Sequence, residues 1–234
     1  MTHISQLTHS PFLLLFLLMA CFESCVWLKK RTGWSIVNPT LITTIMMITA
    51  LKVVHVDWQT FEKASNYLTF WLQPAVVCLA IPLYVQWQKI RNQWLPILVS
   101  QLLGSLVGIV SGVWLVLALG GGDDVAVALS VKSVTMPIAI EVTSKLQGVV
   151  GMTAAAVLIA GVVGQMMGIF LLYLVRAYRP MAQGLAMGTA SHALGTVRVM
   201  QMGERYVAYA TVGLIVNGVL TAFIAPWIVP WLMR

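Results

Sequence analysis

The sequence predicts an all-α polytopic membrane protein, and three observations carry that prediction. Hydrophobic residues make up 59% of the 234-residue chain and charged residues only 9%, and the mean hydropathy is +0.89. Soluble domains contain about 25% charged residues, so this composition excludes an ordinary soluble enzyme and a disordered chain. The apolar residues also form about seven or eight blocks of membrane-helix length, separated by short polar gaps.

The blocks fill the chain from end to end and predict a single integral membrane domain over residues 1–234. In chain order they cover residues 11–28, 34–51, 66–86, 94–119, 125–144, 149–175, 181–200 and 206–232. The first block is expected to be a retained span, because no Lys or Arg precedes it as a signal peptide would require. Tryptophans near several block ends are typical of the aromatic belts at membrane interfaces.

The formal charge of +7 does not indicate nucleic-acid binding, because the basic residues form no stripe on a polar face. They lie at the ends of apolar blocks, as in residues 29–31, at Lys89 and Arg91, and at Arg176 and Arg179. Basic residues at block ends follow the positive-inside rule, by which Lys and Arg mark cytoplasmic loops. A lipid bilayer is therefore the expected surrounding.

Counting sides along the chain predicts that residues 125–144 do not cross the membrane as a plain helix. With residues 29–31 inside, a full crossing by this block would put Arg176 and Arg179 outside, against the charge rule. A re-entrant or broken segment returns both arginines to the inside. Irregular backbone at membrane depth is tolerated where protein or a water-filled cavity surrounds it.

Residues 130–139, SVKSVTMPIA, form the first candidate site. Placing Lys132 at membrane depth costs about 2.5–3.5 kcal/mol, which a cavity or a bound anion would offset. Pro137 frees the carbonyl four residues back, at Ser133, and the hydroxyls of Ser133 and Thr135 lie beside this break. Glu141 is about 13.5 Å away along a regular helix, so a bound carboxylate is the expected partner of Lys132. The alternative is a lysine that reaches the interface beside a simple proline kink.

Residues 184–198, GLAMGTASHALGTVR, form the second candidate site. Gly195 favours a helix break just after His192. His192 is a candidate proton relay and Arg198 a candidate anion anchor, with Ser191 and Thr196 as nearby hydroxyls. The alternative for His192 is a hydrogen-bonded structural role.

The third candidate segment contains Gln73 and Pro74, with a second proline at Pro82. Ala-Ile-Pro-Leu at residues 80–83 aligns with Thr-Met-Pro-Ile at residues 135–138. Proline-interrupted segments in two halves of a membrane protein are typical of an inverted repeat. No Walker A loop, metal-ligand cluster, cofactor motif or hydrolytic triad is present, so neither an enzyme nor ATP-driven transport is expected.

Two stripes of small residues at four-residue spacing predict close helix packing. One stripe comprises Gly104, Gly108 and Gly112, and the other comprises Ala160, Gly164 and Gly168.

The motifs taken together resemble the LrgB/CidB family, including its YohK-type members. The matching segments are Asn38-Pro39, QPAV at residues 73–76, PLY at 82–84, KSVT at 132–135, PIA at 137–139 and ASHALGT at 190–196. The resemblance covers residues 35–228. It departs where the family usually has Pro at Val131 and Thr at Met136, and an acidic residue before Gly-Ala near residues 201–208.

The resemblance implies two functions and a place in the cell. Bacterial members are described as antiholin-like proteins that modulate murein hydrolase export and lysis with a small LrgA/CidA-type membrane partner. A plastidial relative resembles a glycolate/glycerate translocator, and some bacterial members are linked to pyruvate or acetate movement. We expect a secondary transporter or channel subunit for small carboxylates, with the antiholin-like role as the alternative. A multi-pass protein of the bacterial inner membrane, assembling as a homodimer, is also expected.

Overall fold

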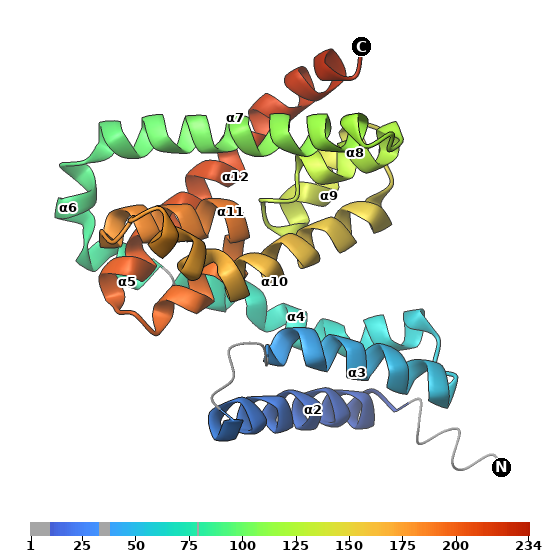
Figure 1. The fold of residues 1–234 in the computed structure, drawn as a ribbon. Coiled ribbons are helices and arrows are strands. Elements are labelled where there is room, and N and C mark those ends of the chain that lie inside the picture. Colours follow the sequence, from blue (N-terminus) through green and yellow to red (C-terminus); the bar gives the residue numbers. More distant parts are fainter. Residues whose placement is uncertain (1–9, 33–37, 79) are drawn as a thin grey trace. The chain divides into compact units, whose positions relative to one another are not determined.

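The structure is a computed structural model that describes residues 10–32, 38–78 and 80–234, with the side chains of residues 72, 73, 75 and 76 left aside. Every regular element in these ranges is an α-helix (Figure 1). The helices are α2 (Pro11–Thr32), α3 (Pro39–Val54), α4 (Trp58–Cys78), α5 (Ala80–Val85), α6 (Trp87–Arg91), α7 (Trp94–Ala118), α8 (Asp123–Ser130), α9 (Met136–Lys145), α10 (Val150–Leu174), α11 (Pro180–Met200) and α12 (Glu204–Leu232). The all-α prediction is confirmed.

Four of the described helices are long and apolar enough to cross a membrane: α2, α7, α10 and α12. Helix α3 is apolar but has only 16 residues. The chain is therefore a multi-pass membrane protein. The apolar blocks at residues 125–144 and 181–200 do not give spans of this kind, and the reason lies in their local geometry.

The chain divides into two compact units, Met1–Cys78 and Leu79–Arg234. In the first unit, α2 packs against α3 and α4, and Leu14, Val56 and Ala64 form a small buried core. Asn38 begins α3, because its Oδ1 accepts hydrogen bonds from the backbone N–H groups of Thr40 and Leu41 at 2.9 and 3.3 Å. A single integral membrane domain stays a prediction.

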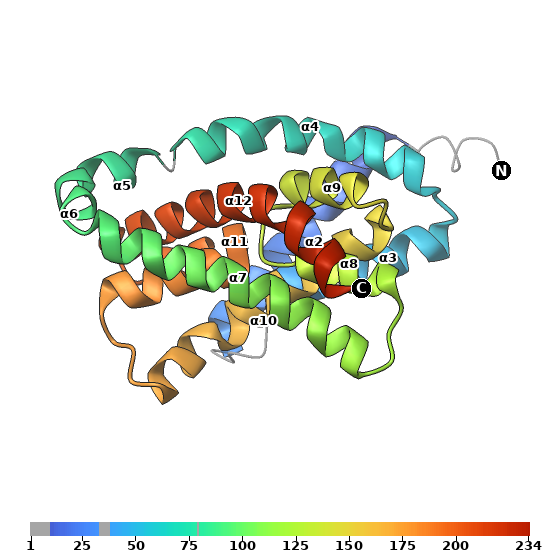
Figure 2. The same cartoon turned by 90° about the horizontal axis from the view of Figure 1, so that it is seen from above.

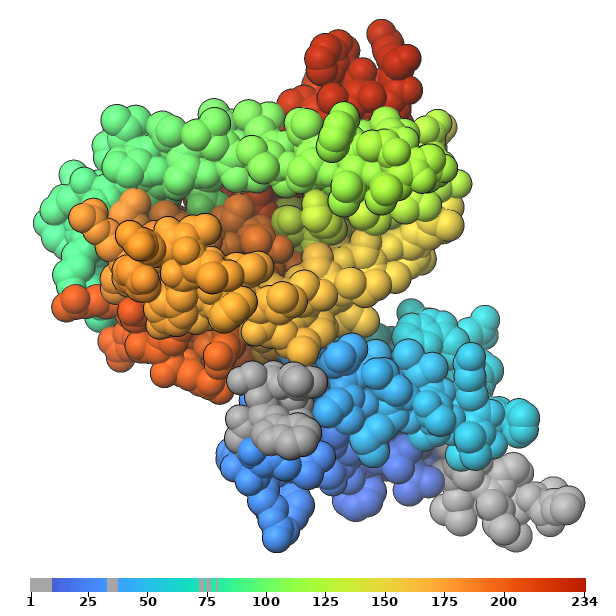
Figure 3. Space-filling model, in the orientation of Figure 1, coloured from blue at the N-terminus to red at the C-terminus, as the bar shows by residue number. Residues whose placement is uncertain are grey.

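In the second unit, the long helices α7, α10 and α12 surround two shorter broken elements (Figures 1 and 2). The outward side of α7, green in Figure 3, carries exposed apolar side chains that suit contact with lipid. They include Leu95, Val99, Leu103, Val107 and Trp114. The small residues of α7 face the interior of the unit instead.

Helices α8 and α9 form a re-entrant hairpin, which confirms the break predicted in residues 125–144. The helix stops at Ser130 and starts again at Met136, and Pro137 occupies the first turn of α9. A side chain on Gly148, just after α9, would lie 2.6 Å from Val127 of α8 and 3.0 Å from Thr143 of α9. Both ends of the hairpin therefore meet at the start of α10, and its tip points inward.

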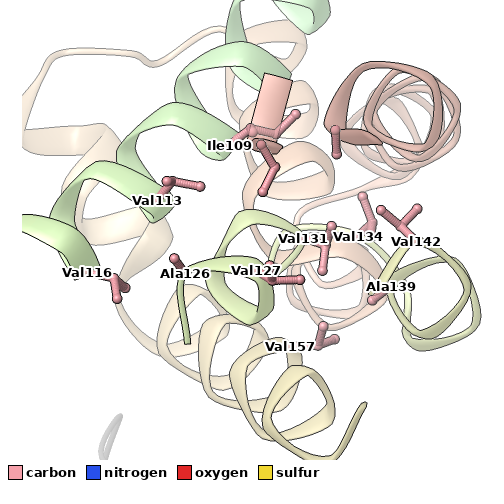
Figure 4. Close-up of a cluster of buried hydrophobic side chains, with 12 residues drawn as sticks. Ile109, Val113, Val116, Ala126, Val127, Val131, Val134, Ala139, Val142 and Val157 are labelled. Carbon is pink, nitrogen blue, oxygen red and sulfur yellow. The ribbon is translucent and has the colours of Figure 1, made fainter. Parts of the chain in front are cut away.

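The first hairpin is anchored by an apolar core around its tip (Figure 4). Val131 and Val134 of the tip are 0% and 1% exposed and pack with Ile109 and Val113 of α7. Val157 of α10 lies in the same cluster. Burial of these valines holds the irregular backbone inside protein, where a lipid-exposed break would leave its polar groups unpaired.

Helix α11 is a second re-entrant hairpin, made of two helical segments that meet at a kink between Pro180 and Met200. His192 has φ 42° and ψ −130°, which reverses the chain at that residue. Gly195 consequently packs against the carbonyl of Met187, a contact that two positions eight residues apart on a straight helix would not make. The break falls at His192 itself, ahead of Gly195.

The two hairpins enter the second unit from opposite ends. Met181, near the start of α11, packs with Ile90 of α6, which precedes α7 in the chain. Helix α8, in contrast, begins after the loop that follows the other end of α7. The end with α6, here called the basic end, carries exposed Lys89, Arg91, Arg176, Arg179 and Arg205. Asp123, Asp124 and Lys145 lie at the opposite end. The positive-inside rule assigns the basic end to the cytoplasmic side.

Candidate functional site at two helix breaks

The tips of the two hairpins are joined by one side chain, that of Asn217 in α12. Asn217 is 1% exposed, and its Nδ2 donates to the carbonyl oxygens of Ser133 and Thr189, each at 3.1 Å. Ser133 lies in the break of the first hairpin, and Thr189 lies three residues before the break of the second. The Ser133 carbonyl is the group that Pro137 was predicted to free, and Asn217 satisfies it.

Other polar side chains continue the network from Asn217 along α7. Ser105 Oγ donates to Asn217 Oδ1 at 2.7 Å, and Thr221 Oγ1 lies 3.4 Å from the same oxygen. Thr189 Oγ1 lies 2.6 Å from Gln101 Oε1. Buried polar groups in a membrane protein cost free energy unless they are hydrogen-bonded, so this network holds the hairpin tips in register with α7 and α12.

The ammonium of Lys132 is held by backbone carbonyls. Its Nζ donates to Gly108 O of α7 at 3.0 Å and to Leu129 O of α8 at 3.4 Å, and the side chain is half-buried. Leu129 is close to the C-terminal end of α8, where the helix dipole favours a positive charge. The structure thus gives Lys132 partners within the protein, and a bound carboxylate as a further partner stays a prediction.

Three of the residues proposed in the second motif lie buried at the break in α11. His192 is 6% exposed, and its Nε2 donates to Val157 O of α10 at 3.1 Å. Ser191 is buried against Gly164 of α10, and Thr196 Oγ1 donates to His192 O at 3.1 Å. A non-glycine residue with this φ is strained, and such strain persists only where packing over-determines it. The contacts of His192 and Ser191 with α10 supply that packing.

The glycines of both stripes lie against the hairpins, which agrees with the close packing that their spacing predicted. A side chain on Gly112 would lie 2.5 Å from Leu129 O and 3.0 Å from Lys132 Nζ, and one on Gly104 would lie 3.2 Å from Thr189. In α10, Gly164 contacts Ser191 and Gly168 contacts Met187. The missing side chains let α7 and α10 approach the hairpins closely.

The other predicted site residues that the structure describes take no part in the network around Asn217. Arg198 is near the end of α11, where its Nη1 donates to Gln201 Oε1 at 3.1 Å. Thr135 occupies the N-cap position of α9 without a side-chain cap bond, and Pro137 is exposed. Pro74 is exposed inside α4 of the first unit, and the side chain of Gln73 lies outside the described residues.

The half-helix ends at the two hairpin tips carry partial charges of opposite sign. The C-terminal carbonyls of the entering half-helices are partly satisfied, Leu129 O by Lys132 and Thr189 O by Asn217. The returning half-helices, α9 and residues 193–200, begin at the breaks and direct their positive N-terminal ends inward. Such ends suit a carboxylate in membrane transporters. Among the described residues, no three His, Cys, Asp or Glu side chains gather as a metal site would require.

Sequence reasoning missed Asn217, Gln101 and Ser105 as members of this centre. Each is one of a few polar residues inside a long apolar block, in α12 or α7. Their polarity at membrane depth was the available signal, because a polar side chain there needs a partner and marks a contact or a functional group. The residues that supply those partners are remote in sequence, so no local motif identified them.

Comparison with known proteins gives the same family along nearly the whole chain. The LrgB-like family matches residues 19–231. The uncharacterized protein YxaC of Bacillus subtilis is 36% identical over 222 residues, which cover 95% of this chain and 96% of the relative. The Antiholin-like protein LrgB of Bacillus mycoides is 32% identical over 206 residues, covering 87% and 89% of the two chains. No solved structure matches the chain. The chain therefore belongs to the LrgB-like family.

Proposed function

We propose that this protein is an antiholin-like membrane protein that modulates murein hydrolase export and cell lysis in the bacterial inner membrane. The observation that carries the proposal is full-length likeness to relatives named Antiholin-like protein LrgB, at 31–32% identity. The matched region includes both hairpins and all the long helices of the second unit. A small membrane protein of the LrgA/CidA type is the proposed partner, and a homodimer stays a prediction.

The proposal is tested in a bacterial strain that lacks its own LrgB-type protein. Expression of this chain with the small partner should change the rate of induced lysis and the murein hydrolase activity in the medium, measured by zymography. The chain and partner should also copurify from detergent-solubilised membranes. An unchanged lysis rate with normal membrane levels of both proteins would contradict the proposal.

A second candidate function is the passage of small carboxylates such as glycolate, glycerate or pyruvate, without ATP hydrolysis. One observation favours it: two re-entrant hairpins enter from opposite ends and their tips are joined at Asn217. Broken helices meeting inside a membrane protein provide half-helix ends that bind ionic substrates. A protein that only associated with other helices would not need Lys132 and His192 at such breaks.

This candidate is tested with the purified full chain in proteoliposomes, with and without the small partner. Uptake of labelled glycolate, glycerate and pyruvate should exceed that of empty liposomes. His192→Gln should reduce uptake, because His192 holds the tip of the second hairpin against Val157. Absence of uptake for all three anions, under conditions that support the lysis phenotype, would leave the antiholin-like role alone.

A further inference from the structure

A cavity at the basic end of the second unit lies between the segment around α6 and the start of α12. Its volume is about 420 Å³, and its lining includes Gln86 and Lys89 on one side and residues 202–206 on the other. It is open to the surroundings, and it is separate from the hairpin tips joined by Asn217. Neither proposed function uses it.

The charges that line this cavity favour an anion. Lys89 and Arg205 contribute two cations, and Glu204 contributes one carboxylate. Within the described part of the chain, Glu204 forms no ion pair with either cation. Arg91, Arg176 and Arg179 lie at the same end but do not line the cavity.

The backbone at the start of α12 adds to this preference. Gly203, with φ 122°, precedes the helix and provides no side-chain cap. The first helical hydrogen bonds are made by the N–H groups of Tyr206 and Val207 to Gly203 O, at 3.1 and 3.3 Å. The N–H groups of Glu204 and Arg205 precede them, at the positive end of a 29-residue helix.

The aromatic residues around the cavity place it at the level of lipid headgroups. Tyr84, Trp87 and Trp94 are 83%, 52% and 61% exposed and lie on α5, α6 and the first turn of α7. Exposed Tyr and Trp at the ends of membrane helices mark the interface between hydrocarbon and water. A ligand in this cavity would therefore meet the headgroup layer of the leaflet on the basic side.

We propose that this cavity binds the phosphate of an anionic phospholipid, with Lys89 and Arg205 as its cationic ligands. Basic pockets between membrane helices on the cytoplasmic side are suited to anionic headgroups. The phosphate oxygens would accept hydrogen bonds from both side chains and from the free N–H groups at the start of α12. Glu204 opposes the anion and leaves one net positive charge in the lining, which matches a monoanionic headgroup.

The test uses the detergent-purified full chain titrated with dioleoylphosphatidylglycerol or dioleoylphosphatidylcholine, with bound lipid counted by native mass spectrometry. Phosphatidylglycerol should bind more tightly. Lys89→Gln with Arg205→Gln should weaken its binding about 25-fold, about fivefold for each cation. Arg176→Gln with Arg179→Gln removes two charges from the same end outside the cavity, and it should change binding less than twofold.

Equal weakening by both double variants, or by neither, would overturn the proposal, because surface charge alone would then explain binding. Glu204→Gln provides a second measurement should the first double variant fail to fold. It removes the opposing carboxylate and should tighten phosphatidylglycerol binding about fivefold, whereas no change would contradict the site. Free glycerol 3-phosphate is the third arm. Binding as tight as that of the lipid would show a soluble phosphate site and overturn the assignment to lipid.

Discussion

Ser105 and Asn217 share a buried hydrogen bond of 2.7 Å, although 112 positions separate them in the chain. Because Ser105 donates to Asn217 Oδ1, the Nδ2 group of the amide is directed toward the two hairpin tips, where it meets the carbonyls of Ser133 and Thr189. A hydroxyl on α7 therefore sets the orientation of the amide that joins both breaks. This relationship makes Asn217 the most informative position for mutation.

Asn217→Leu should lower the free energy of unfolding by about 1–3 kcal/mol, because it removes the donors to two buried carbonyls and leaves Ser105 without its acceptor. The measurement is thermal unfolding of the purified protein followed by tryptophan fluorescence. Thr221→Val is the matched control on the same helix, because it loses only the 3.4 Å contact with Asn217 Oδ1. Equal melting temperatures for Asn217→Leu and the unchanged protein would contradict the assigned network.

Helix α10 offers a matched pair of glycines for testing the close packing of the second hairpin. A side chain on Gly164 would overlap Ser191, whereas nothing lies within 4 Å of the corresponding position on Gly151. Gly164→Ala should therefore destabilise the protein by about 1–3 kcal/mol. Gly151→Ala should be neutral or slightly stabilising, since alanine favours a helix over glycine. The packing is wrong if the two variants have the same melting temperature.

The first hairpin was predictable from sequence because two independent signals coincide there. The distribution of basic residues between the two sides of the membrane requires this segment to leave the membrane on the side where it entered. Pro137 supplies the helix break. The second hairpin is harder to predict from sequence. Residues 180–200 contain no internal proline, and the reversal depends on the backbone conformation of His192 alone. Gly195 indicated a break nearby, but its role is to let the returning half-helix pack against Met187.

The partners of the site residues were not predictable, for a geometric reason. The position of Pro137 in the sequence shows that the carbonyl of Ser133 loses its helical donor. It does not show that the amide of Asn217, 84 positions away, donates to this carbonyl instead. The charge of Lys132 reveals a need for partners, but the carbonyl of Gly108 becomes accessible only because α7 approaches through its glycines. Such contacts depend on how helices pack and leave no local pattern.

The hairpins also predict which positions are accessible from the same side of the membrane. In a cysteine-free background, Asp124→Cys and Lys145→Cys should both react with an impermeant thiol reagent added from one side. Lys89→Cys and Arg179→Cys should both react from the other side, because α6 and the start of α11 both lie at the basic end. All four side chains are exposed, so accessibility depends on the side alone. Labelling of Asp124→Cys and Lys145→Cys from opposite sides would contradict the re-entrant geometry.

Lys132 gives a test of whether its carbonyl partners stabilise the fold. Lys132→Met keeps the length of the side chain and removes its hydrogen bonds to Gly108 O and Leu129 O. We expect a lower melting temperature, by an amount matching about 1–2 kcal/mol, because two part-buried hydrogen bonds from a charged donor are lost. Lys145→Met, which removes an exposed charge at the end of α9, is the control and should change stability by less than about 0.5 kcal/mol. An unchanged melting temperature for Lys132→Met would show that the ammonium is not needed for stability.

Replacement by methionine should have opposite effects on the melting temperature at Gln183 and at Gln101. Gln183 in α11 is 1% exposed, and among the described residues neither its Nε2 nor its Oε1 has a hydrogen-bond partner. An unpaired buried amide costs about 1–3 kcal/mol, so Gln183→Met, which keeps the volume, should raise the melting temperature. Gln101 is 2% exposed, but its Oε1 lies 2.6 Å from Thr189 Oγ1, so Gln101→Met should lower the melting temperature. Both variants are measured by fluorescence-detected unfolding at matched detergent concentration. A loss of stability in Gln183→Met would show that its amide has a bound partner, such as ordered water, in the protein.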